Sequence, residues 1–153
     1  MPDLDAHAFS VLNRWLHVAA MAIAFGGAGL MTLLALTRPG LGAPELLRVA
    51  TVYERAFWAA AGVLVMTGVG NLGAFGAQLP GRDSAWGVTL LAKLALVVAL
   101  TLLSLPRTLV VAQVAAIADG GSVRTAPLLA RLYLATLGAL VAILAFAVWL
   151  SHG

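Results

Sequence analysis

Four long stretches of the chain are almost free of charged side chains. Residues 15–37, 56–81, 84–106 and 132–153 contain 23, 26, 23 and 22 residues, and Lys93 is the one Asp, Glu, Lys or Arg among them. A helix needs about 20 apolar residues to cross a bilayer core of about 30 Å. The pattern therefore predicts four membrane-spanning helices, over about residues 9–36, 44–75, 85–118 and 125–151.

The segments between these stretches contain residues that end helices. Pro39 and Gly40 follow the first stretch, Pro80 and Gly81 follow the second, and Gly120-Gly121 follows the third. The apolar runs show no alternation with a period of two, which a membrane β-barrel would require. We therefore expect a single domain over residues 1–153, an all-α integral membrane bundle of four helices.

The composition indicates lipid as the solvent. Apolar residues make up 62% of the chain, charged residues 10%, and the mean hydropathy is +1.01. A soluble domain has about 45–50% apolar and about 25% charged residues, so a soluble enzyme domain and a disordered chain are both disfavoured. The net charge of +3 comes from scattered arginines and does not indicate nucleic-acid binding. The absence of cysteine excludes disulfides, thiolate metal sites and iron–sulfur clusters.

The basic residues predict an orientation. Arg38, Arg48 and Arg55 fall around the first link, and Arg107, Arg124 and Arg131 around the third, whereas the opposite side has only two arginines, at positions 14 and 82. Cytoplasmic loops of membrane proteins carry the excess of Lys and Arg. We therefore expect a multi-pass protein of a bacterial inner membrane, with both termini on the extracytoplasmic side.

A few polar residues lie within the predicted spans, where they are costly and indicate function. Lys93 is ten residues beyond Asp83, about 15 Å of helix rise. His17 lies in the outer part of the first helix, and Asn71 and Thr67 lie in the outer half of the second. The predicted orientation places all of them between the midplane and the extracytoplasmic surface.

The histidines and methionines are the candidate metal ligands. Imidazole binds copper, iron, nickel and zinc, and thioether sulfur suits Cu(I). His17 and Met21 are four residues apart and therefore share a helix face, and Met66 of the second helix is a candidate third ligand. His7 and His152, at the outer ends of the first and fourth helices, are weaker candidates. The alternative is that each is a packing or solvated residue.

Lys93 also has two interpretations. Its ammonium group either reaches water along a flexible stem or contacts an anion, such as a haem propionate, or the haem iron. Trp86 lies near it and is a candidate for the same polar lining, although an interfacial aromatic belt explains all four tryptophans, at positions 15, 58, 86 and 149. We interpret Glu54, Arg55 and Arg48 as a solvated cytoplasmic face. Since no nucleophile has a plausible partner base, hydrolytic chemistry is disfavoured.

The third helix carries a family resemblance. Residues 84–98 read SAWGVTLLAKLALVV, which resembles the CopD-like copper-resistance membrane domain, where an aromatic-Gly pair precedes Leu-Leu-x-Lys. Thr67-Gly68 is similar to that family's Ser/Thr-Gly near the end of helix two, and Trp15-Leu16-His17 followed by Phe25-Gly26-Gly27 to its first-helix histidine and aromatic-Gly-Gly. The resemblance implies copper handling at the inner membrane, with a periplasmic copper carrier or a second copy supplying further ligands.

A second resemblance is to the HemJ-type membrane proteins, which hold haem and oxidise protoporphyrinogen. His17, the Glu54-Arg55 pair and Lys93 correspond to that family's positions, although the expected Pro-Arg after helix one reads Arg38-Pro39 here. This resemblance implies a haem b with His17 as axial ligand and Lys93 near the iron or a propionate. A third hypothesis is a cofactor-free accessory subunit of a larger membrane complex.

Overall fold

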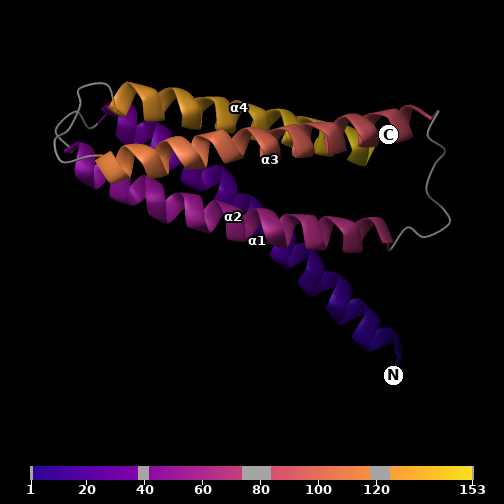
Figure 1. Cartoon of the computed structure of the whole chain (residues 1–153). Helices are drawn as coiled ribbons and strands as arrows, with labels where there is room; N and C mark the ends of the chain where they lie inside the picture. Colours follow the sequence, from indigo (N-terminus) through magenta and orange to yellow (C-terminus); the bar gives the residue numbers. More distant parts are fainter. Residues whose placement is uncertain (1, 38–41, 74–83, 118–124, 153) are drawn as a thin grey trace.

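The chain is all-helical. A computed structural model describes residues 2–37, 42–73, 84–117 and 125–152. They form α1 (Pro2–Thr37), α2 (Ala43–Gly73), α3 (Ala85–Ile117) and α4 (Thr125–His152), shown in Figure 1. Each helix contains a segment long and apolar enough to cross a membrane, as the charge-free stretches predict.

The predicted helices agree with the observed ones to within two residues at every end except the first. α1 begins at Pro2 rather than near residue 9. Proline is favoured at the first position of a helix, because its missing N–H would have no partner there. The residues expected to end the helices, Pro39-Gly40, Pro80-Gly81 and Gly120-Gly121, lie outside the described residues.

The helices pack in the cyclic order α1, α2, α3, α4. α1 packs against α2 and α4, and α3 packs against the same two helices from the other side. The bundle has two ends, named here the Thr37 end and the Pro2 end. At the Thr37 end, α1 and α3 finish and α2 and α4 begin; at the Pro2 end, α1 begins and α4 finishes. In Figure 1, α1 crosses the bundle obliquely and its N-terminal part points away from the other helices.

The apolar core is concentrated toward the Thr37 end. It consists of residues from the second half of α1, the first half of α2, the second half of α3, and the first and middle parts of α4: Ala24, Ala28, Met31, Leu46, Leu47, Ala50, Tyr53, Phe57, Val111, Leu129, Tyr133 and Leu140. α3 is buried at only four positions, Gly87, Ser104, Arg107 and Val111. The Pro2 half of the bundle is therefore the less tightly packed half.

Of the first-helix glycines, Gly27 is the one that permits a close approach. A Cβ atom at Gly27 would overlap the ring of Tyr53, whereas a Cβ at Gly26 or Gly29 would meet no atom within 4 Å. The Tyr53 hydroxyl then donates a 2.8 Å hydrogen bond to the Ala24 carbonyl. Close packing of α1 on α2 thus depends on one glycine and one tyrosine.

Candidate functional site

A buried ion pair joins α2 to α3. Arg107 Nη2 donates a 3.0 Å hydrogen bond to Glu54 Oε2, and Arg107 Nε lies 2.9 Å from Glu54 Oε1 as an ion-pair contact. The side chains of Arg107 and Glu54 are only 2% and 5% exposed. An unpaired charge at such a depth would be very costly, so each residue depends on the other.

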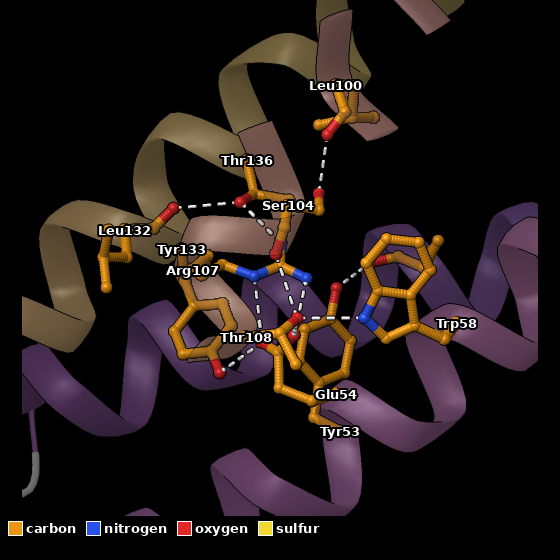
Figure 2. Close-up of polar contacts among 11 residues, drawn as sticks. Tyr53, Glu54, Trp58, Leu100, Ser104, Arg107, Thr108, Leu132, Tyr133 and Thr136 are labelled. Carbon is orange, nitrogen blue, oxygen red and sulfur yellow. Dashed lines mark hydrogen bonds and ion pairs between the residues drawn. The ribbon is translucent and has the colours of Figure 1, made fainter. Parts of the chain in front are cut away.

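Hydroxyl groups complete the surroundings of this pair, as Figure 2 shows. The Tyr133 hydroxyl of α4 donates to Glu54 Oε1 at 2.9 Å, and the Thr108 hydroxyl donates to Oε2 at 2.5 Å. Thr108 in turn accepts a 2.9 Å hydrogen bond from Trp58 Nε1. Both carboxylate oxygens therefore have partners, and three of the four helices contribute side chains to the network.

Three aromatic rings surround the Arg107 guanidinium group. Its central carbon lies 4.3 Å from the centroid of Phe57, 5.4 Å from that of Tyr133 and 5.8 Å from that of Tyr53. Arg107 Nη1 also donates a 2.7 Å hydrogen bond to the Thr136 hydroxyl. Cations are attracted to aromatic faces within about 6 Å, most strongly where water is absent. The rings thus stabilise the arginine as well as filling the core.

These contacts correct two expectations from the sequence. Glu54 is buried and lies inside a helix segment that can cross a membrane, so it does not belong to a solvated face. Arg48 and Arg55 are exposed, as expected. Arg107 is likewise buried inside α3 rather than part of a link. Without Arg107, five of the six arginines counted on the predicted cytoplasmic side remain, against two on the opposite side. The excess of basic residues still favours the predicted orientation.

Trp58 is also not a belt residue. Its indole nitrogen bonds to Thr108 and its ring packs edge-on against Phe57, with centroids 5.7 Å apart. Trp15 and Trp149 fit the belt interpretation better, because they are 65% and 72% exposed. Trp86 is half-buried.

A second polar group lies toward the Pro2 end, between α1 and α2. His17 Nδ1 is 2.8 Å from the Thr67 hydroxyl, and that hydroxyl lies 2.6 Å from the Val63 carbonyl of its own helix. A hydroxyl has one proton to donate. In the tautomer in which His17 donates Nδ1–H to Thr67, Thr67 donates its own proton to Val63 and the histidine lone pair is on Nε2. The described residues give Nε2 no hydrogen-bond partner.

Asn13 reinforces this helix pairing. Its side-chain nitrogen donates a 3.2 Å hydrogen bond to the Thr67 carbonyl, one helical turn from His17 on α1. An added Cβ at Gly70 would come within 3.3 Å of the Asn13 amide. The position of His17 relative to α2 is therefore fixed by two independent side-chain hydrogen bonds.

The other predicted site residues are distributed unevenly. Lys93 of α3 is half-buried and lies in the Pro2 half of the bundle, the half that contains His17. Met21 is half-buried one turn after His17, whereas Met66 is 77% exposed and lies outside this polar group. His7 is exposed. The side chains of Asn71 and His152 lie outside the described residues.

The donor set constrains what this group can bind. Among the described side chains there is no cluster of three or more His, Cys, Asp or Glu residues suited to a metal ion. What the structure shows is one imidazole bonded to a hydroxyl, one methionine a turn away on the same helix, and one half-buried lysine on α3 in the same half of the bundle. Metal-binding histidines commonly have this arrangement, in which the second ring nitrogen donates to a fixed acceptor and the free nitrogen can bind the metal.

Comparison with known proteins adds no family assignment: no protein-family model, curated protein or solved structure matches this chain. The chemistry of the site must therefore be inferred from its own residues.

Proposed function

We propose that this chain is a multi-pass protein of a bacterial inner membrane that holds a haem b through His17. The observation that carries the proposal is the 2.8 Å hydrogen bond between His17 Nδ1 and the Thr67 hydroxyl, because the tautomer that donates from Nδ1 leaves Nε2 as a ligand atom. One axial histidine is sufficient to hold haem iron. Bound haem would supply one-electron redox chemistry, for electron transfer or for porphyrinogen oxidation.

The residues around His17 fit haem better than a complete copper site. Lys93 of α3 is half-buried in the same half of the bundle as His17; as an ammonium group it would favour the carboxylates of a haem propionate and disfavour a bare copper ion. Thr67 and Asn13 provide the fixed α1–α2 geometry that holds the ligand in place. With both termini outside, as the arginine distribution predicts, the haem would lie in the extracytoplasmic half of the membrane.

Copper handling of the CopD-like type is the second candidate, favoured by the half-buried Met21 one turn from His17. An imidazole and a thioether together suit Cu(I). The chain brings only these two donors together in its described part, so a second copy or a periplasmic copper carrier would have to complete the coordination.

The test is an absorption spectrum and a metal analysis of the same detergent-purified protein, expressed with haem and copper supplied. We expect a Soret band in the wild type that is lost in His17→Ala. His7→Ala is the matched control, because His7 lies exposed on the same helix and its loss should leave the band unchanged.

Other outcomes decide between the candidates. A colourless protein that retains copper, and loses it in both His17→Ala and Met21→Ala, would contradict the haem proposal and support copper. Protein that binds neither group, and purifies with partner subunits whether or not His17 is present, would support the accessory-subunit hypothesis.

A further inference from the structure

A groove open to the outside runs between α2 and α3 toward the Thr37 end. One hollow there has a volume of about 380 Å³, and its lining includes Glu54, Arg55, Trp58 and Ala112. A second hollow of about 210 Å³ is lined by residues that include Arg48, Leu47 and Ala115. Thr51 lines both hollows, so they are neighbours on the α2–α3 face, and the two together are called the groove.

The sequence explains both the space and the charge of this groove. On α3, alanines at positions 112 and 115 leave room opposite α2. On α2, Arg48 and Arg55 are seven residues apart, two turns along one face and about 10 Å of helix rise. Both are exposed, and neither forms an ion pair with a described residue.

The groove is polar at one end and apolar at the other. Arg48 lies near the start of α2, whereas Trp58 is ten residues further into the bundle, about 15 Å along the helix. Beside Trp58 the lining continues with Val111 and Ala112. The one carboxylate in the lining, Glu54, is neutralised by Arg107, so the arginines determine the charge that the groove presents.

We propose that this groove binds an anionic phospholipid. The phosphate group lies between Arg48 and Arg55, and an acyl chain follows the apolar lining toward Trp58. Basic pockets between membrane helices recognise acidic headgroups, and each basic residue near the surface strengthens binding by about fivefold. A zwitterionic lipid has the same chains but no net charge, so we expect the groove to discriminate between the two. The inference is independent of any cofactor at His17.

Trp58 provides a direct test. A variant retaining only this tryptophan (Trp15→Phe, Trp86→Phe, Trp149→Phe) is placed in bilayers containing brominated phosphatidylglycerol or brominated phosphatidylcholine, and fluorescence quenching is measured against mole fraction. We expect half-maximal quenching at a mole fraction at least fivefold lower for phosphatidylglycerol. Arg48→Gln with Arg55→Gln should abolish this preference, whereas Arg131→Gln, at an exposed arginine of α4 outside the groove, should preserve it.

Equal quenching by both lipids, or equal effects of the groove and Arg131 variants, would overturn the proposal. Absence of quenching by either lipid would also overturn the phospholipid proposal. That result would favour a second copy of this chain as the molecule that covers the groove. A second measurement keeps the native tryptophans: phosphatidylglycerol should raise the thermal unfolding midpoint of the detergent-purified wild type more than phosphatidylcholine does, and the double arginine variant should lose this difference. Equal midpoint shifts for the two lipids in the wild type would count against the site.

Discussion

Glu54 and Arg107 lie 53 residues apart in the chain and form an ion pair inside the bundle, with Arg107 Nη2 3.0 Å from Glu54 Oε2. Around the pair, Tyr133 and Thr136 bring in α4, and Tyr53 connects the same region to α1 through its hydrogen bond to Ala24. The network thus joins α2, α3 and α4, and Tyr53 attaches α1 to the same region.

Arg107→Met should destabilise the protein by about 3–5 kcal/mol, because it leaves the Glu54 carboxylate buried without its counter-charge. The free energy of unfolding can be measured by denaturant titration in detergent micelles. Arg131→Met is the matched control, since Arg131 is exposed on α4, and it should change stability by less than about 0.5 kcal/mol.

The double variant Glu54→Leu with Arg107→Met should be less destabilised than Arg107→Met alone, because it removes both charges together. Additive losses in the double variant would show that the two residues do not stabilise each other, contrary to the geometry.

Tyr133→Phe should lower the free energy of unfolding more than Tyr53→Phe does. The Tyr133 hydroxyl donates to a charged carboxylate, whereas that of Tyr53 donates to a neutral backbone carbonyl. Hydrogen bonds to charged groups contribute about 1.5–3 kcal/mol and neutral ones about 1 kcal/mol. Unfolding titrations of the two variants side by side test the difference, and a larger loss for Tyr53→Phe would contradict the role of Tyr133 as a partner of Glu54.

Gly27→Ala should destabilise the α1–α2 packing by about 1–3 kcal/mol, the usual cost of overpacking a filled core. The added methyl group would overlap the Tyr53 ring. Gly29→Ala, two residues along, meets no atom within 4 Å and should be neutral or slightly stabilising, since alanine favours helices. Equal changes in the thermal unfolding midpoint for Gly27→Ala and Gly29→Ala would contradict the close contact between Gly27 and the Tyr53 ring.

Thr67→Val should weaken cofactor retention about 10–100-fold, because it removes the group that orients His17. Thr67→Ser keeps the hydroxyl and should retain the cofactor. Thr101→Val is a control for hydroxyl loss in general, since Thr101 bonds only to the Val97 carbonyl of its own helix. The readout is the dissociation constant for the group identified at His17. An unchanged dissociation constant in Thr67→Val would contradict the role of Thr67 in orienting the histidine.

The helices were predictable because lipid imposes a simple requirement. A chain that crosses a bilayer must satisfy its own backbone hydrogen bonds, so four charge-free stretches of spanning length predict four helices. The sequence also marks His17 and Thr67 as polar residues in the outer halves of their helices, but it does not predict that the two are paired. The identity of the partners depends on how α1 rotates against α2, which a single sequence does not specify.

The charge-free stretches do not predict the buried ion pair, because charged residues define the ends of those stretches. Glu54 and Arg107 flank charge-free stretches, yet the predicted helices 44–75 and 85–118 already placed each of them ten or more residues inside a helix. Two opposite charges deep within two helices are a signal for a buried pair. Recognising which charges meet still requires the packing of α2 against α3.

The uneven distribution of the core has a consequence for motion. Because the ionic network and most core residues lie toward the Thr37 end, opening fluctuations should begin at the other end, where α1 diverges from its neighbours (Figure 1). Amide hydrogen exchange should thus be faster along residues 10–20 than along residues 46–57. A bulky planar molecule can then reach His17 by a local separation of α1, without the loss of the remaining fold.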